Sequence, residues 1–353
     1  LCLEKRDPRY RAPLDRAIGF VLESQHPGGG WPQRWPHADD GPEYMRYITF
    51  NDDVAGENIK FLTMVHQTLG DPRALPAIRR AMDSILATQQ PAPQPGWGLQ
   101  HTLDGKPAAA RSYEPLALAT HTTATNLSQL MSFYELTGDP KYLARVGEGL
   151  DWLEKVKLRE PRNGRSHPTF IEIGTDRPLY VHRRGSNVVN GEYYVDHSPD
   201  RTLGHYSGFR TVDVAGMRAR LETLKATPPA EASKGSPLLS NKPVPLPKYF
   251  SGQDIATADL ATVRALKGRP SAEAVAKILA DLNADGWWPS PLTATSHPYR
   301  GPGPKTPTPG DYATTHVGDS WDTSPFPDPA PKTGIAIAKY LENMAALIAW
   351  LDA

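Results

Sequence analysis

Cysteine, net charge and long apolar runs are all scarce in this chain, and each scarcity excludes a class of protein. Cys2 is the only cysteine among 353 residues, which excludes an internal disulfide and a thiolate metal cluster. Lysine plus arginine and aspartate plus glutamate each total 39, so the sequence has no electrostatic footprint for nucleic acid. No apolar run approaches the roughly 20 residues that a membrane-spanning helix needs. We therefore expect neither nucleic acid nor a membrane as a partner.

Proline and glycine, by contrast, are abundant. The 36 prolines and 29 glycines make up about a fifth of the chain, which predicts long irregular connections. The chain starts at Leu1 without the features of a signal peptide. We expect a secreted or periplasmic protein from which a signal peptide has been removed, and we expect a monomer.

One helical segment occurs three times. An Asp-Pro-Arg or Asp-Pro-Lys tripeptide opens each copy, at residues 7–9, 71–73 and 139–141, with offsets of 64 and 68 residues. Asp at the N-cap and Pro at the first helical position are typical of a helix start. Apolar residues then follow at i, i+4 and i+7 or i+8, the spacing of a core-facing helix. Two copies also follow a second apolar helix pattern, at 58–69 and 125–136, so the repeating unit is a helix pair plus a long loop.

Helix pairs of this kind must pack side by side, because one pair cannot bury its apolar stripe alone. Further helix patterns lie at 274–282 and 333–351. The last helix has the character of the partner that the first helix lacks, and docking of the two would close a ring. We therefore predict an all-α fold, an (α/α) toroid of repeated helix pairs with long irregular loops and a few short strands.

The toroid is expected to be a single domain over residues 1–353, with three irregular stretches. Residues 160–210 indicate an ordered excursion with short strands, because Pro, Gly and Asn alternate there with β-branched and aromatic residues. Residues 225–247 and 289–331 are rich in proline and are interpreted as surface loops or linkers.

Gly-Trp loops follow helix patterns at Trp31, Trp97 and Trp287. Loops at equivalent helix ends would line one end of the array, where their tryptophans could stack on a ligand ring. The alternative is that each indole fills the core of its helix pair. The sequence favours neither interpretation for any single tryptophan.

The densest polar constellation is Asn51-Asp52-Asp53, directly before a helix expected to begin near Glu57. Two adjacent carboxylates and an amide offer the hard oxygen ligands that Ca²⁺ prefers. Helix capping is the alternative, but one cap does not require three polar residues in succession. We interpret the triplet as a candidate calcium site.

Two arginine-bearing segments are candidates for binding an anionic substrate. Arg111 lies three residues before Glu114, and its guanidinium could bind a carboxylate through its fork, although a surface Arg–Glu pair is the simpler alternative. Three arginines fall within eight residues further on, and a fourth follows: Arg177, Arg183, Arg184 and Arg201. An acidic ligand explains this basic focus in a neutral protein better than a solvated loop does.

Short motifs occur in a fixed order between residues 6 and 206. They are Gly-Gly-Trp-Pro-Gln at 29–33, Ile-Thr-Phe-Asn-Asp-Asp at 48–53, Gln-His at 100–101, Ala-Arg-Ser-Tyr-Glu at 110–114, and Arg177 and Arg183 with Gly185. In order and spacing this set resembles family 10 of the polysaccharide lyases, pectate lyases with an (α/α)₃ toroid. Each motif alone is short, but the ordered set is specific.

The resemblance implies a lyase that cleaves an acidic uronate polymer, with pectate or polygalacturonate as the expected substrate and Ca²⁺ as the cofactor. Arg111 matches the family's proposed Brønsted base. Asp52 matches an aspartate that binds calcium and substrate, and Asn51 and Asp53 are expected to complete the metal site. Arg183 matches an arginine that contacts the substrate carboxylate. The other expected substrate contacts are Arg177, Arg201, Trp31, Trp97, His101 and Glu114.

The chemistry of a uronate lyase suits these residue types. Such an enzyme removes the proton at C5, beside the C6 carboxylate, and expels the O4 oxygen. Neutralising the carboxylate acidifies the C5 proton, and Ca²⁺ or arginine can do this. A guanidinium normally stays protonated, so a basic Arg111 would need adjacent positive charge and desolvation. If Arg111 stays charged, it is a carboxylate clamp and the base lies elsewhere.

Two other classes of protein remain open. A glycoside hydrolase on a helical toroid needs two carboxylates flanking the scissile bond. The candidates are Asp52, Asp53, Glu114, Asp319 and Asp322. A non-catalytic glycan-binding protein would use the tryptophans of the Gly-Trp loops. An unsaturated uronate product, a new reducing end, or binding without turnover distinguishes the three classes.

Overall fold

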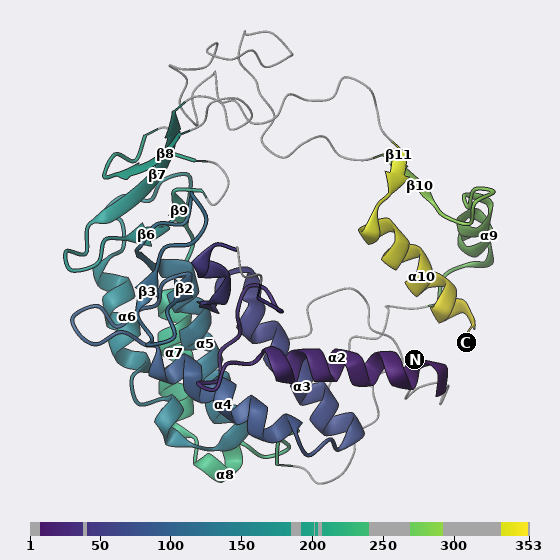
Figure 1. The fold of residues 1–353 in the computed structure, drawn as a ribbon, viewed down its shortest axis with the longest axis horizontal. Helices are drawn as coiled ribbons and strands as arrows, with labels where there is room; N and C mark the ends of the chain where they lie inside the picture. Colours follow the sequence, from purple (N-terminus) through teal and green to yellow (C-terminus); the bar gives the residue numbers. More distant parts are fainter. Residues whose placement is uncertain are drawn as a thin grey trace.

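The computed structural model describes residues 8–37, 41–184, 192–200, 202–203, 207–239, 269–291 and 333–351. Helices dominate this part of the chain, and its strands are short (Figure 1). The α-helices are α2 (Arg11–Ser24), α3 (Val54–Leu69), α4 (Ala74–Ala87), α5 (Thr120–Thr137), α6 (Val146–Lys155), α7 (Val214–Ala226), α8 (Pro229–Ala232), α9 (Ala272–Ala280) and α10 (Ile337–Leu351). The 3₁₀ turns are η1 (Pro8–Tyr10), η2 (Glu43–Arg46), η3 (Asn51–Asp53) and η4 (Pro140–Tyr142).

The strands form four small antiparallel sheets, in the orders β1-β2-β3, β4-β6-β7-β8, β5-β9 and β10-β11. Their bounds are β1 (Ile48–Thr49), β2 (Gln100–His101), β3 (Pro107–Ala108), β4 (Leu118–Ala119), β5 (His167–Pro168), β6 (Phe170–Ile171), β7 (Pro178–Arg184), β8 (Glu192–Asp196), β9 (Phe209–Arg210), β10 (Pro289–Pro291) and β11 (Thr333–Ile335). Strands β6, β7 and β8 confirm the expected short strands between residues 169 and 206.

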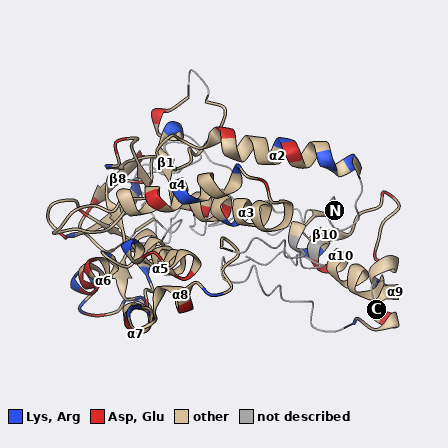
Figure 2. Cartoon of the chain, turned by 90° about the horizontal axis from the view of Figure 1, so that it is seen from below, with Lys and Arg blue, Asp and Glu red and all other residues tan. Residues whose placement is uncertain are grey.

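The repeat seen in the sequence is a repeat in the structure. Helices α2, α4 and α6 each lead through a loop with one or more strands to a second helix, which is α3, α5 and α7 respectively. Helix α9 leads in the same way through β10 and β11 to α10, so this region is a fourth unit of the same kind. Successive helices pack on one another from α2 through to α7, and Figure 2 shows this stack from the side, with charges of both signs interspersed.

Each unit contains a ring N–H that donates to a carbonyl near the end of its first helix. The donor and acceptor pairs are Trp31 and Val21 (2.8 Å), Trp97 and Ile85 (3.1 Å), His167 and Leu153 (3.0 Å), and Trp288 and Ile278 (2.7 Å). The acceptors in the first three units are 64 and 68 residues apart, the offsets of the sequence repeat. The bond therefore fixes each loop at an equivalent place on its helix.

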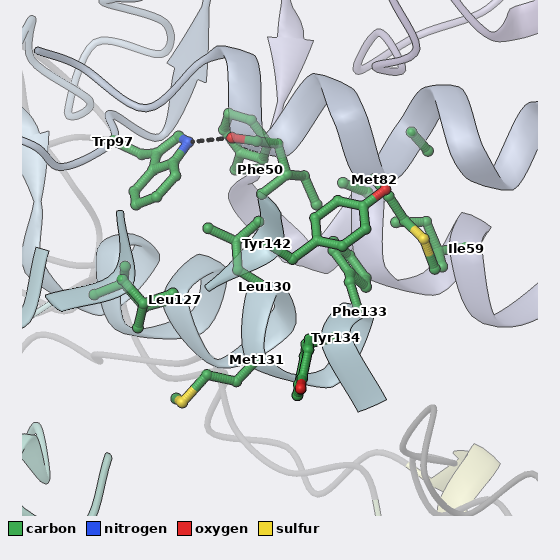
Figure 3. Close-up of a cluster of buried hydrophobic side chains, with 14 of the residues drawn as sticks. Phe50, Ile59, Met82, Trp97, Leu127, Leu130, Met131, Phe133, Tyr134 and Tyr142 are labelled. Atoms are coloured by element: carbon green, nitrogen blue, oxygen red, sulfur yellow. Dashed lines mark hydrogen bonds between the residues drawn. The ribbon is translucent and has the colours of Figure 1, made fainter. Parts of the chain in front are cut away.

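The core lies between these helices. Its largest fully buried apolar side chains include Trp31, Trp97 and Phe133. Figure 3 shows Trp97 among apolar side chains of α3, α4 and α5, with its indole N–H in a hydrogen bond. A smaller apolar cluster, which includes Phe170 and Leu179, lies beneath the β4-β6-β7-β8 sheet.

The helix starts differ from the sequence prediction. Asp139 caps the 3₁₀ turn η4 by accepting from the Lys141 backbone N–H, and α6 begins only at Val146. Asp71 likewise accepts from the Arg73 backbone N–H, and α4 begins at Ala74. The Asp-Pro sequence thus stabilises a turn that precedes the α-helix. The tripeptide at 7–9 lies partly outside the described residues.

Three other boundaries are corrected. Helix α7 was not predicted, although Asp213 gives it an N-cap by accepting from the Gly216 backbone N–H. Residues 333–335 are a strand rather than the first turn of the last helix, because they pair with β10. The expected linker at 225–247 contains the end of α7 and all of α8, and its residues from 240 onward lie outside the described part.

A closed toroid is not established. The described helices α3 to α8 form an arc in Figure 1, and α9 and α10 pack as a separate pair. In the described residues, no helix is both long and apolar enough to cross a membrane.

Candidate active site

The Asn51-Asp52-Asp53 turn is held in place by the β1-β2 pair. Thr49 lies opposite Gln100 in this sheet, and the next two backbone N–H groups, of Phe50 and Asn51, both donate to the Leu99 carbonyl. Asp52 and Asp53 both have φ of 55°, in the left-handed region that Asp tolerates better than most residues. The backbone then enters α3 at Val54, so both carboxylates lie at the start of that helix.

Arg111 joins this turn from the segment between β3 and β4. Its Nη2 lies 3.0 Å from Asp52 Oδ2 and 2.9 Å from Glu114 Oε1. The side chains of Arg111 and Asp52 are 26% and 63% exposed, so both are open to solvent. The pairing of sequence-distant residues confirms that the turn and the arginine motif belong to one cluster.

Glu114 is the buried centre of this cluster, with a side chain only 1% exposed. Its Oε2 accepts from the Arg111 backbone N–H at 3.0 Å, and its Oε1 accepts from Asn51 Nδ2 at 2.7 Å. A buried carboxylate is tolerated only when it is paired and hydrogen bonded, as it is here. Glu114 therefore positions Arg111 and Asn51, and its direct contact with substrate stays a prediction.

Two carboxylates beside one guanidinium favour its charged form. The local charge therefore supports the carboxylate clamp for Arg111 rather than the base. The Arg111 guanidinium also lies over the Tyr113 ring, 5.6 Å from its centroid, which further restricts its orientation.

A cavity of about 300 Å³ opens beside the turn. Asn51, Asp52 and Asp53 line one side, and polar residues of α5 line the other. Among these is His121. Its pKa is lowered to about 3, mainly by burial and also by the nearby charge of Arg210, so its imidazole is neutral near pH 7. A larger hollow of about 450 Å³ shares the Gly56 wall and continues between α3, α5 and α7.

The turn offers oxygen atoms of the type that calcium binds, but few of them. In the described residues, no three His, Cys, Asp or Glu side chains gather as a metal cluster. Asp52 is paired with Arg111, and Asp53 Oδ2 lies 3.7 Å from Lys60 Nζ. Calcium takes roughly 6–8 oxygen ligands. The residue types fit calcium, but most of the coordination of such an ion would have to come from water and substrate.

Trp31, Trp97 and His101 are buried in this structure. The two indoles are at most 1% exposed and fill the core, as the alternative interpretation expects, and a substrate contact by any of the three residues stays a prediction. His101 is fully buried; its Nε2 accepts from the Gly98 backbone N–H and its Nδ1 donates to the Gly105 carbonyl. Trp287, in the third Gly-Trp loop, is half-buried, and it is the neighbouring Trp288 that fills the core there.

The arginines of the second motif are dispersed. Arg183 lies on β7 with a side chain 1% exposed, so in this conformation it does not present its guanidinium to solvent. Arg177 is exposed just before β7. Arg201, Asp319 and Asp322 lie outside the described residues. Substrate contacts by these three arginines stay predictions.

Sequence reasoning missed the polar face of α5. His121, Thr125, Asn126 and Gln129 all line the cavity beside the turn. The last three lie four, five and eight residues after His121, which places all four on one face of a helix. The signal was present in the sequence, but the helix pattern was assigned from its apolar residues alone.

The structure defines an α-helical repeat protein with a carboxylate–guanidinium cluster between two of its loops. A family model described as pectic acid lyase matches residues 3–204, more than half of the chain. The chain therefore belongs to the pectic acid lyase family, which confirms the resemblance drawn from the motifs. The matched range contains Asp52, Arg111, Glu114 and the polar face of α5.

Solved structures give a weaker similarity. The chain is similar to the family 10 polysaccharide lyase from Cellvibrio cellulosa, and to a mutant of that enzyme in complex with trigalacturonic acid. Each is 23% identical, with a TM-score of 0.43, over 50% of this chain. The alignment spans 63% of the other chain, less than two thirds of its length. No curated protein matches the chain.

Proposed function

We propose that this chain is a polysaccharide lyase that cleaves an acidic uronate polymer, with pectate or polygalacturonate as the substrate, by β-elimination. The observation that carries the proposal is the Asp52–Arg111–Glu114 cluster, whose Asp52 lines a cavity within the part of the chain that matches the family. The guanidinium is exposed enough to meet a substrate carboxylate and is held from behind by a buried one.

In this proposal Arg111 binds the C6 carboxylate of the sugar whose C5 proton is removed. Charge neutralisation at C6 acidifies that proton and stabilises the enolate-like intermediate. Glu114 holds the guanidinium in place before substrate arrives, so little orientation entropy is lost on binding. The alternative role of Arg111 as the base would require the guanidinium to lose its proton in spite of the two adjacent carboxylates.

Asp52 and Asp53, with the side-chain oxygen of Asn51, are the residues that would hold calcium. Bound there, the ion would supply further positive charge to the substrate carboxylate. Its affinity without substrate should be weak, because these side chains provide only part of its ligands.

The test is an assay on polygalacturonate, with calcium and with chelator. A lyase gives an ultraviolet-absorbing unsaturated uronate, and chelator should lower the rate. A new reducing end without that absorbance would indicate a glycoside hydrolase. Binding without any turnover would indicate a glycan-binding protein. Glu114 is buried and shares the Arg111 guanidinium with Asp52, which disfavours this pair as the two carboxylates of a hydrolase. Secretion and a monomeric state stay predictions.

A further inference from the structure

We propose that the 300 Å³ cavity beside Asp52 is a subsite for the hydroxyl groups of a sugar ring, formed by His121, Asn126 and Gln129 of α5. This inference rests on the proposed function, since it assumes that the ligand is a uronate polymer. It goes beyond it by assigning residues that none of the motifs contains.

The three side chains lie on one face of α5, opposite the Asn51-Asp52-Asp53 turn. The helix thus presents polar residues to the same cavity as the carboxylates, one of which, Asp52, pairs with Arg111. A volume of about 300 Å³ lies at the lower end of the range for small-ligand pockets. One sugar ring is a ligand of suitable size.

Each of the three side chains has a buried polar atom that lacks a hydrogen-bond partner in the described part of the chain. These atoms are His121 Nδ1, Asn126 Nδ2 and Gln129 Oε1. Asn126 is 2% exposed. Buried polar atoms are nearly always paired, because leaving one unpaired is costly. Three residues that carry such atoms line one cavity, and a polar ligand that enters it can supply the missing partners once the side chains rotate toward it.

The chemistry of these groups suits hydroxyl groups. The Asn126 amide nitrogen can only donate and the Gln129 amide oxygen can only accept, whereas a sugar hydroxyl does both. No lysine or arginine lines the cavity, and Asp52 and Asp53 lie on its other side. A carboxylate would be repelled there. The ring would therefore direct its carboxylate to Arg111 and its hydroxyls to α5.

Gly56 of α3 allows the wall of the cavity to close around Gln129. A Cβ at this position would lie 3.0 Å from Gln129 Nε2 and would overlap the Asp53 carboxylate. Any larger residue would thus displace both the amide and the acidic turn. The glycine couples the position of the amide to that of the candidate catalytic cluster.

The test compares two ligands: trigalacturonate and the same trimer with its carboxylates reduced to alcohols. The reduced trimer keeps the ring hydroxyls but lacks the acidic C5 proton, so it binds without turnover. We expect Gln129→Leu and Asn126→Ala to weaken binding of the reduced trimer about 5–10-fold, the loss typical of one hydrogen bond. Both variants should raise KM for polygalacturonate more than they lower kcat. Gln67→Leu, the same change at the far end of α3, should change neither.

Arg111→Gln supplies the opposite pattern. This variant should bind trigalacturonate more weakly than the parent does and should bind the reduced trimer with unchanged affinity. The inference is overturned if the parent does not bind the reduced trimer at millimolar concentration in an NMR titration. It is also overturned if the correctly folded Gln129→Leu and Asn126→Ala variants bind both trimers as the parent does. The same holds if they lose affinity for trigalacturonate but not for the reduced trimer. Absence of an unsaturated product from the parent, with the Gln129 effect retained, would instead reject the lyase proposal alone.

Discussion

A single buried carboxylate organises the candidate active site. Glu114 receives hydrogen bonds from Asn51 and from the Arg111 backbone, and it pairs with the Arg111 guanidinium. It thereby links the acidic turn to the arginine loop, which are about 60 residues apart in the chain. The motif placed Arg111 and Glu114 in one loop, but their link to Asn51 depends on the pairing of β1 with β2. Sequence spacing cannot show that contact.

Glu114→Gln tests this organising role. The amide keeps the shape but loses the charge and one acceptor, so we expect the free energy of unfolding to fall by about 1–3 kcal/mol. We expect kcat/KM on polygalacturonate to fall about 10–100-fold, because Arg111 is no longer held. Urea denaturation and steady-state kinetics measure the two effects. Glu154→Gln, which removes an exposed partner of Lys157, is the matched control and should change neither by much.

Arg111→Lys separates a clamp from a base. Lysine keeps the charge but cannot contact Asp52 and Glu114 with one planar group. For a clamp, we expect measurable turnover to remain, with most of the loss in KM. A loss in kcat at the upper end of the ~10²–10⁴-fold range typical of general bases, with polymer binding intact, would assign the base to Arg111 instead. Steady-state kinetics with a parallel binding assay decide between them.

His101 makes stability depend on pH. Burial lowers its pKa from 6.5 to about 4, because the charged imidazole is disfavoured in the core. The unfolded chain therefore binds a proton between pH 6.5 and 4 that the folded chain does not, and stability falls as pH falls through that window. The slope should be roughly 1.4 kcal/mol per pH unit for this group. In His101→Gln, urea unfolding at several pH values should show a shallower dependence of stability on pH than in the parent.

At the scale of elements, periodicity predicted most of the helices correctly. It gave α2 to α6, α9 and the greater part of α10, because each carries an apolar face that the core requires. It missed α7, whose only clear start signal is the Asp213 cap, and it misplaced helix starts where Asp-Pro stabilises a preceding turn. Tertiary pairing made residues 333–335 a strand, and no local pattern contains that information.

The buried rings of the loops give a prediction at this scale. Trp97→Phe keeps most of the apolar area but removes the hydrogen bond to the Ile85 carbonyl. We expect a loss of about 1–2 kcal/mol in the free energy of unfolding, from the lost hydrogen bond and the smaller ring. KM should stay unchanged, because the ring does not reach the cavity. A rise in KM without loss of stability would instead support the interpretation that Trp97 stacks on a sugar ring of the substrate. Trp35→Phe, at a half-buried loop position, serves as the control.

At the scale of the whole molecule, the site lies where two loops of neighbouring units meet. The acidic turn precedes α3, and the arginine loop precedes α5, so each unit contributes one half of the cluster. The order of the motifs indicated the family, but the position of α5 at the cavity follows from the packing of α3, α4 and α5. A repeat architecture thus builds a site from equivalent loops that carry different side chains.

The ring that anchors the loop also makes three of the four units visible to fluorescence spectroscopy. Three of the four anchors are tryptophans, and an indole in a dry core emits at shorter wavelength than one in water. With the remaining tryptophans replaced, a chain retaining only Trp31, only Trp97 or only Trp288 would report the opening of one unit. Denaturation curves from the three chains would then show whether the repeats melt together or one after another, as linear arrays of weakly coupled modules do.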